Sequence, residues 1–117
     1  MNMNHQLSLV LQNDLNIEKL GSISAVHNPK DTNHLERRQQ QRAISLSMIK
    51  VAIVYGSRQF SYGAVTYTLT DKNLRRTPYS RFIDVLRGLR VVCVNGLPNP
   101  KIMTAYWHNK TKRKVHR

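Results

Sequence analysis

One histidine and two arginines recur at intervals of four residues near the middle of the chain: His34, Arg38 and Arg42. On a helix, residues four apart lie nearly above one another, so these side chains would share one face. An imidazole can carry a proton near neutral pH, and a guanidinium offers planar donors that fit phosphate oxygens. The pattern therefore indicates a site for a phosphate group. A solvated basic helix face with a capping histidine fits the same pattern.

A second group of candidate side chains lies near the C-terminus, on a predicted strand over residues 101–108. Side chains of a strand alternate between its two faces. One face would hold Ile102, Thr104, Tyr106 and His108, the last three of which carry polar groups. The other would face the core with Met103, Ala105 and Trp107. Hydroxyl, phenol and imidazole groups can bind a phosphate or move a proton. An ordinary amphipathic strand with one wet face is the alternative.

The net charge of the chain points to a polyanionic partner. The 117 residues include 19 Lys and Arg but only 6 Asp and Glu, which gives a formal net charge of +13. Such an excess opposes folding through self-repulsion, and nucleic acid is the commonest partner of strongly basic domains. Further cations that we expect to bind nucleic acid are Arg37, Arg75, Arg76, Arg81, Lys110, Lys112, Arg113 and Lys114.

The acidic residues and the single cysteine argue against a metal site. The acids are scattered singly, at Asp14, Glu18, Asp31, Glu36, Asp71 and Asp84. Mg²⁺ or Ca²⁺ chemistry uses converging carboxylates, and one cysteine cannot build a cysteine-rich zinc site. Cys93 is expected to be a small buried hydrophobe in a strand. The sequence shows no membrane-spanning run and no signal peptide. We therefore expect a cytoplasmic protein with no cofactor, no metal and no membrane partner.

The apolar pattern divides the chain into three parts. Residues 1–30 form an N-terminal extension, helical near 6–20 or partly disordered, although alternating leucines at 7, 9 and 11 also fit a strand. Residues 31–108 form a single domain. Residues 109–117 are a basic tail, which we expect to be disordered alone and to bind phosphates nonspecifically.

Within the domain, two helices precede a run of strands. The first helix should begin at Asn33, and the second should be capped by Ser45 and end at Gly56 in the C′ position. Strands are predicted at 58–62, 64–70, 89–95 and 101–108. Between them, residues 78–88 suit a short helix, with a strand over 82–86 as the alternative. The predicted fold class is α+β, with two N-terminal helices packed on a small, mainly antiparallel sheet.

Four segments of the chain carry a resemblance to a known family: HLERRQQQRAISLSMIKVAIVYG, YTLTD, LRGLRVVCVNG and KIMTAYWHNK. Their marks are the pattern His-x-x-x-Arg-x-x-x-Arg-x-Ile-Ser and the closing Ile-x-Thr-x-Tyr. Together they resemble a small uncharacterised domain family, grouped with RelE- and BrnT-like toxins in the barnase–EndoU–colicin–RelE class of ribonucleases. The similarity covers about residues 34–110, and residues 1–30 and the basic insert 72–81 lie outside it.

The resemblance implies a toxin-like endoribonuclease that needs no metal and has a RelE- or barnase-like fold. In that reaction the 2′-hydroxyl of RNA attacks the adjacent phosphate and leaves a 2′,3′-cyclic phosphate. His34 would carry a proton, Arg38 and Arg42 would clamp the phosphate, and Thr104 and Tyr106 would orient it. His108, proposed as a second proton carrier, matches no catalytic position of the family and rests on its chemistry alone.

The partners implied are RNA, free or ribosome-associated, and an antitoxin or another acidic protein. Two other functions suit the same cations. One is a nucleic-acid-binding module without catalysis, and the other is a basic interaction protein that docks an acidic partner. Cleavage of RNA would distinguish the ribonuclease from the binding module. RNA binding that weakens steeply with salt would distinguish the binding module from the interaction protein.

Overall fold

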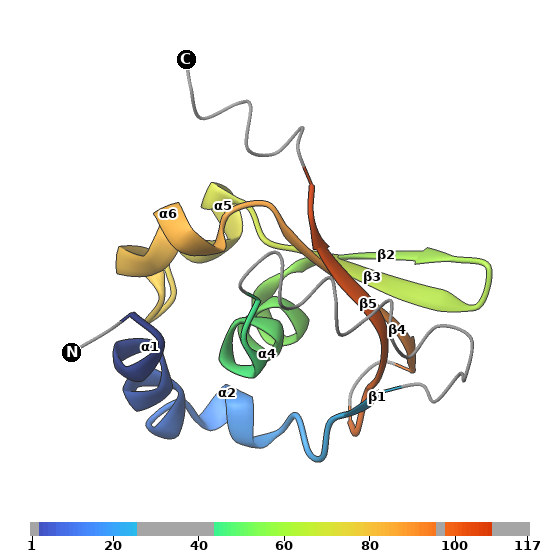
Figure 1. The fold of residues 1–117 in the computed structure, drawn as a ribbon, viewed down its shortest axis with the longest axis horizontal. Coiled ribbons are helices and arrows are strands. Elements are labelled where there is room, and N and C mark those ends of the chain that lie inside the picture. The colour runs from blue at the N-terminus through green and yellow to red at the C-terminus, as the bar shows by residue number, and fades with distance from the viewer. Residues whose placement is uncertain (1–2, 26–43, 96–97, 109–117) are drawn as a thin grey trace.

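A five-stranded sheet with a helix packed across one face organises the computed structural model, which describes residues 3–25, 44–95 and 98–108 (Figure 1). The helices are α1 (Met3–Gln12), α2 (Leu15–Glu18), α4 (Leu46–Tyr55), α5 (Asp71–Leu74) and α6 (Ile83–Leu86), with a 3₁₀ helix η1 (Ser80–Phe82) before α6. The strands are β1 (Ser24–Ala25), β2 (Ser57–Ser61), β3 (Ala64–Thr68), β4 (Leu89–Asn95) and β5 (Lys101–Trp107).

The sheet has the strand order β1-β5-β4-β3-β2. The pairs β2–β3, β3–β4 and β4–β5 are antiparallel, and only the short β1 runs parallel to its neighbour β5. The predicted α+β class with a mainly antiparallel sheet is therefore confirmed. The first predicted helix, which starts at Asn33, lies outside the described residues.

The helix α4 begins and ends where the sequence predicted, with one difference at its end. Oγ of Ser45 accepts a hydrogen bond of 3.3 Å from the backbone N–H of Met48, which caps the first turn. Gly56 ends the helix in an extended conformation, so the predicted left-handed C′ geometry is wrong. A glycine is needed for another reason: a Cβ at this position would lie 2.5 Å from the carbonyl oxygen of Ala52.

The core lies between α4 and the sheet. Its members from α4 are Met48, Ile49, Val51, Ala52 and Ile53, and its members from β3 and β4 include Val65, Tyr67, Leu89, Val91 and Cys93. These strand residues occupy alternate positions, as the predicted half-buried strands require. Cys93 is fully buried, as predicted, and burial raises the pKa of its thiol to about 11.

The segment before β1 belongs to the same core. Leu7 and Leu11 of α1 are buried, as is Leu20 after α2. The helix predicted over 6–20 is interrupted, because Oδ1 of Asp14 accepts a hydrogen bond from the N–H of Asn16 and starts α2 as a new helix. Ser24 and Ala25 then pair with the first residues of β5.

The connection between β3 and β4 is helical, so the alternative strand over 82–86 is wrong. Phe82 and Leu86 are buried against the core, and Val85 packs beside them. Gly88, with a φ of 87°, closes the connection before β4.

The predicted alternation of β5 is wrong at two residues, Ile102 and Met103. Cys93 pairs with Ile102 while Val92 pairs with Thr104, so Met103 has no partner in β4 and forms a bulge. The bulge turns Ile102 into the core, at 4% exposed, and leaves Met103 47% exposed. Beyond the bulge the prediction is confirmed: Ala105 is buried and Trp107 packs against the core.

Candidate functional site

Three neighbouring strands bring one arginine, one hydroxyl and one phenol together on the face of the sheet opposite α4. Thr68 of β3 pairs with Arg90 of β4, and Arg90 pairs with Tyr106 of β5. Directly paired residues project from the same face of a sheet. All three side chains are half-buried. We call this group the Arg90 row.

The side chain of Arg90 is held in place by its two neighbours. Its Nε donates a hydrogen bond of 3.0 Å to Oγ1 of Thr68. Its guanidinium carbon lies 6.0 Å from the centroid of the Tyr106 ring, within reach of a cation–π contact. Among the described residues, no carboxylate pairs with Arg90. Within the described ranges the guanidinium is therefore oriented but has no carboxylate to neutralise it, a state that suits binding of a phosphate group.

A second row of side chains lies next to the Arg90 row on the same face. Thr66 of β3 pairs with Val92, and Val92 pairs with Thr104 of β5. On the edge strand β2, the positions that pair with Thr66 and Thr68 are Gln59 and Ser57. Hydroxyl and amide groups thus surround Arg90, and each can donate a hydrogen bond to an oxyanion.

The predicted site residues fall into three groups, one of which, Arg75, Arg76 and Arg81, lies in the connection between β3 and β4. Thr104 and Tyr106 lie on the face that also carries Arg90, and His108 follows two positions later, where its backbone N–H bonds to the carbonyl of Gly88. The imidazole of His108 is half-buried. The remaining predicted residues of the helix and the tail lie outside the described residues: His34, Arg37, Arg38, Arg42, Lys110, Lys112, Arg113 and Lys114.

Sequence reasoning missed Arg90, although a signal for it was present. In the strand 89–95 it is the single charged residue among apolar ones, and it sits at a position that alternates with the buried Leu89 and Val91. A single arginine on the outer face of a valine-rich strand could have identified Arg90 as a candidate site residue.

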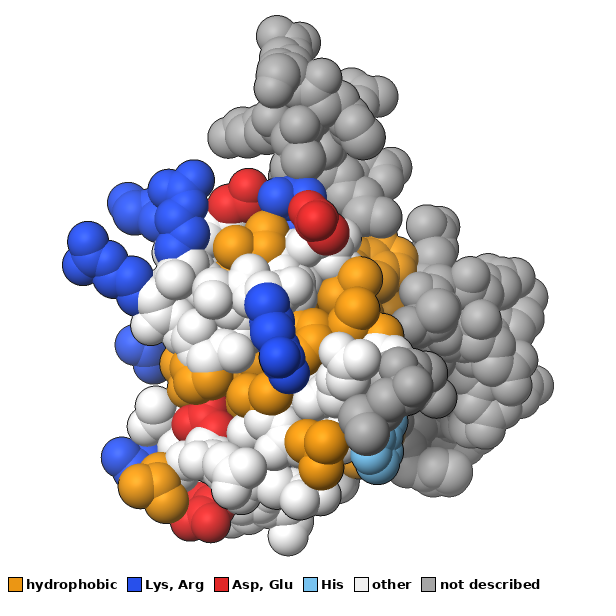
Figure 2. All heavy atoms as spheres, turned by 90° about the vertical axis from the view of Figure 1, so that its left-hand side faces the viewer, with side chains coloured by type: hydrophobic (Ala, Val, Ile, Leu, Met, Phe, Trp, Pro, Cys, Tyr) orange, Lys and Arg blue, Asp and Glu red, His pale blue; other side chains and the backbone are white. Residues whose placement is uncertain are grey.

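Exposed cations lie at the same end of the sheet as the Arg90 row. Thr68 ends β3, and α5 begins three residues later, carrying Lys72 and followed by Arg75 and Arg76. All three are exposed, as is Arg81 of η1, whose guanidinium lies 4.9 Å from the centroid of the Phe82 ring. On the face that carries α1 and α6, Lys and Arg side chains project from the surface (Figure 2). We call Lys72, Arg75 and Arg76 the α5 cations.

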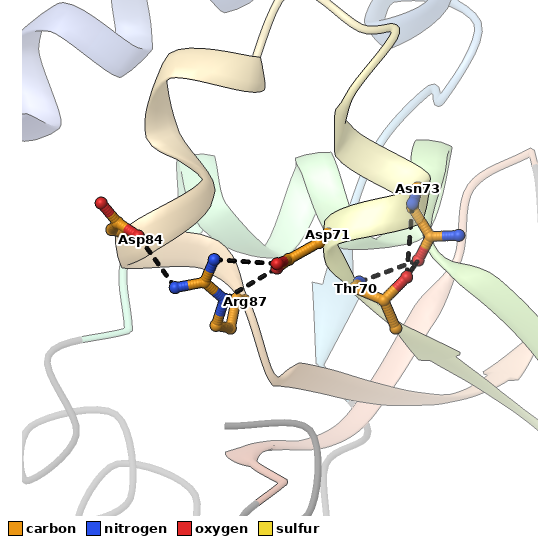
Figure 3. Close-up of polar contacts among 5 residues, drawn as sticks. All are labelled: Thr70, Asp71, Asn73, Asp84 and Arg87. Atoms are coloured by element: carbon orange, nitrogen blue, oxygen red, sulfur yellow. Dashed lines mark hydrogen bonds and ion pairs between the residues drawn. The ribbon is translucent and has the colours of Figure 1, made fainter. Parts of the chain in front are cut away.

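Arg87, a further cation of this connection, serves the fold instead. Its Nε and Nη2 donate to the two carboxylate oxygens of Asp71, at 2.7 and 2.9 Å, and its Nη1 donates to Asp84 (Figure 3). These hydrogen bonds hold the pKa of Asp71 below its ordinary value of 3.8. Thr70 and Asn73 cap the same turn of α5 reciprocally. Arg87 thus fastens α6 to α5.

Asp14 is the buried carboxylate of the described residues, at 7% exposed. Its Oδ2 accepts hydrogen bonds from the phenols of Tyr55 and Tyr79, at 2.7 and 2.9 Å. The two tyrosine rings lie 5.5 Å apart, centroid to centroid. No sequence signal predicts this cluster, because the tyrosines lie 41 and 65 positions away along the chain.

The acids of the described residues are thus largely committed to the fold. Asp14 binds two tyrosines, and Asp71 and Asp84 bind Arg87, which leaves Glu18 on the exposed surface of α2. In the part of the chain that the structure describes, the α5 cations and Arg90 therefore form no ion pair with an acid. In the described ranges, no three His, Cys, Asp or Glu side chains gather where they could hold a metal ion.

The structure is that of an α+β protein with Arg90 among hydroxyl groups on one face of its sheet and with exposed cations on the connection that follows β3. No helix within residues 3–25, 44–95 and 98–108 is long and apolar enough to cross a membrane. Comparisons with models of protein families, with curated proteins and with solved structures gave no match. The resemblance to RelE- and BrnT-like toxins therefore stays a prediction from the sequence.

Proposed function

We propose that this protein binds RNA through the Arg90 row and cleaves it as a toxin-like endoribonuclease without a metal. The observation that carries the proposal is Arg90, a half-buried guanidinium oriented by Thr68 and Tyr106, with no carboxylate partner among the described residues. An arginine that is fixed but not neutralised suits an incoming phosphate, and in a cleavage reaction it stabilises the charge that develops there.

The α5 cations support RNA as the ligand. They begin four residues after Thr68, so a phosphate chain bound at the Arg90 row can continue across them. Each phosphate neutralised by a cation adds affinity that falls with salt. An RNA of several nucleotides uses both groups, whereas a small phosphorylated molecule needs only the first.

The chemistry of the proposed cleavage needs a proton acceptor for the 2′-hydroxyl and a proton donor for the leaving 5′-oxygen. His34 is the proton carrier proposed from the sequence, with Arg38 and Arg42 beside the phosphate, and His108 is the proposed second carrier. Thr104 and Tyr106 contribute donors that orient the phosphate. The proposal places the protein in the cytoplasm, with an acidic protein such as an antitoxin as its restraining partner.

The test is a cleavage assay on a labelled mixed-sequence RNA in EDTA, with analysis of the product ends. The wild-type protein should leave 2′,3′-cyclic phosphate ends, and Arg90→Gln should lower both RNA affinity and cleavage by more than tenfold. Lys19→Gln is the matched control. It also removes one exposed positive charge, but Lys19 is far in the sequence from the Arg90 row and the α5 cations. His34→Ala should abolish cleavage and leave affinity nearly unchanged.

Other results would favour one of the two alternative functions. If RNA is bound and stays intact, the protein is a nucleic-acid-binding module and the cleavage reaction is excluded. If RNA is not bound at all, while an acidic protein is retained on the same cations, the protein is an interaction protein. Arg90→Lys separates charge from geometry, because a lysine keeps the charge and loses the planar fork.

A further inference from the structure

The hairpin of β2 and β3 carries two aromatic side chains that the fold does not use. Phe60 is 74% exposed and Tyr62 is 106% exposed. The hairpin projects from the sheet on the side away from α1 and α6 (Figure 1). A Cβ added at Gly63, at the tip, would meet no atom within 4 Å. Aromatic side chains that stay in water add little hydrophobic stabilisation to the fold, and neighbouring exposed ones can mark a binding surface.

The backbone of Tyr62 strengthens this point. The hairpin turns through Tyr62 and Gly63, whose φ angles are 51° and 76°. Two-residue turns of this kind favour Asn or Asp at the first position, and a bulky residue with positive φ is strained. Asn99, with a φ of 60°, shows the ordinary choice elsewhere in the chain. The tip therefore keeps an aromatic residue where the turn itself favours a small polar one.

The charge around the tip indicates what binds it. Residues 57–68 contain no acid, and their one charged side chain is Arg58, which is exposed. The whole chain carries a formal net charge of +13, which opposes close contact with a second copy of itself. Exposed aromatic rings beside a cation are the elements with which proteins bind single-stranded nucleic acid, because every base offers a flat face for stacking.

We propose that Phe60 and Tyr62 form a stacking platform for unpaired bases of a single-stranded RNA, with Arg58 on its backbone. This inference rests on the proposed function, since the same RNA strand would reach the Arg90 row. Phe60 and Arg58 pair with the buried Val65 and Tyr67, so they project from the face of the sheet that carries α4, and the Arg90 row lies on the other face. An RNA that contacts both places must pass round the edge strand β2, which requires a flexible strand. The substrate is thus an RNA that is unpaired along this stretch.

The test measures affinity for a single-stranded RNA of about twelve nucleotides, a trinucleotide and an RNA duplex. Phe60→Ala and Tyr62→Asn should each lower affinity for the long single strand by about five- to one-hundredfold. Neither should change affinity for the trinucleotide, which cannot span both places, or for the duplex, whose bases are already stacked. Arg90→Gln should weaken all three. Quenching of a 2-aminopurine base in the long strand by the wild-type protein reports stacking directly.

The design separates a binding role of the tip from a structural one. Tyr62→Asn relieves the backbone strain, so the variant should melt at the same or a higher temperature than the wild type while binding RNA more weakly. Leu15→Ala is the matched control, because Leu15 is also an exposed apolar residue, at 71%, and lies on α2. It should leave RNA affinity unchanged.

Three results would overturn the inference. If both hairpin variants bind the long strand like the wild type while Arg90→Gln weakens it, the proposed function stands and the stacking platform does not exist. If sedimentation shows that Phe60→Ala converts a dimer to a monomer without changing RNA affinity, the tip contacts a second copy of the chain. If the wild-type protein binds none of the RNAs, the proposed function fails and this inference fails with it.

Discussion

The phenol of Tyr79 donates a hydrogen bond of 2.9 Å to Oδ2 of Asp14, although the two residues lie 65 positions apart in the chain. Tyr55 of α4 donates to the same oxygen at 2.7 Å. One carboxylate thereby joins the start of α2, the end of α4 and the connection before η1. Since α4 packs on the sheet, this cluster fixes the N-terminal helices to the body of the domain.

Tyr79→Phe should destabilise the fold by about 1–2 kcal/mol, because it removes one donor from a buried carboxylate and keeps the ring in place. Asp14→Ala should cost more, about 2–4 kcal/mol, since both phenols lose their acceptor and α2 loses its cap. Urea unfolding measures both. Glu18→Gln, an exposed acid on the same helix, is the control and should stay within about 0.5 kcal/mol of the wild type. Equal stability of Tyr79→Phe and the wild type would contradict a stabilising role for the cluster.

The same cluster predicts a loss of stability at alkaline pH. Burial, reinforced by Asp14, raises the pKa of Tyr79 above its ordinary value of 10.0, and burial also raises that of Tyr55. A tyrosine that stays protonated in the folded state stabilises it below pH 10, and this contribution disappears as the pH rises above 10. The urea midpoint should therefore fall above pH 10 less steeply in Tyr79→Phe than in the wild type. Identical slopes would mean that Tyr79 titrates normally in the folded protein.

The contact of Arg87 with Asp71 predicts a loss of stability at acidic pH. Because the pKa of Asp71 is held below 3.8, the ionised carboxylate stabilises the fold above that pH, and the contribution is lost as the pH falls below it. Arg87→Ala should cost about 1–2 kcal/mol near neutral pH, after allowance for the partial exposure of Asp71. Urea unfolding between neutral pH and pH 3 should show a smaller fall in the variant. A parallel fall in both proteins would assign the acid sensitivity to other carboxylates.

Local rules in the sequence predicted α4 and the strands β2 to β5, because each of these elements left a residue-specific mark, whereas α5 and β1 were not predicted. Ser45 caps α4, alternation marks β3 and β4, and Gly56 ends the helix, although close approach to Ala52 and not a left-handed turn explains that glycine. Contacts between distant residues left no such mark. The phenols that bind Asp14 come from elements whose packing is decided only by the tertiary structure.

The candidate site was predictable only within one strand, because contacts between different strands leave no mark in the sequence. Alternation in the strand 101–108 placed Thr104 and Tyr106 on one face, and the structure adds Arg90 from the neighbouring strand. A sequence does not give the pairing register between β4 and β5, so it could not say which residue lies beside Tyr106. The bulge at Met103 is also a property of the pairing of two strands, and alternation along one strand misses it.

The bulge makes a prediction that distinguishes it from simple alternation. Ile102→Ala should destabilise the fold by about 2–5 kcal/mol, because it empties a buried position, 4% exposed. Met103→Ala should stay within about 0.5 kcal/mol, because that side chain is 47% exposed. Uninterrupted alternation predicts the reverse order. Urea unfolding of the two variants therefore decides between the two arrangements of β5.

The α5 cations predict how RNA binding should respond to salt. If Arg75 and Arg76 each neutralise one phosphate of a single strand, replacing both with Gln should reduce the slope of log affinity against log salt by about 1.4, at about 0.7 per phosphate. The loss should be similar for RNAs of different sequence, because phosphate contacts do not read bases. Folding should be unaffected, since both side chains are exposed and no described acid pairs with them. Titrations of a labelled RNA at several salt concentrations measure the slope, with Lys19→Gln as the control. An unchanged slope in the double variant would mean that Arg75 and Arg76 do not contact RNA phosphates. RNA binding would then be assigned to the Arg90 row without the α5 cations.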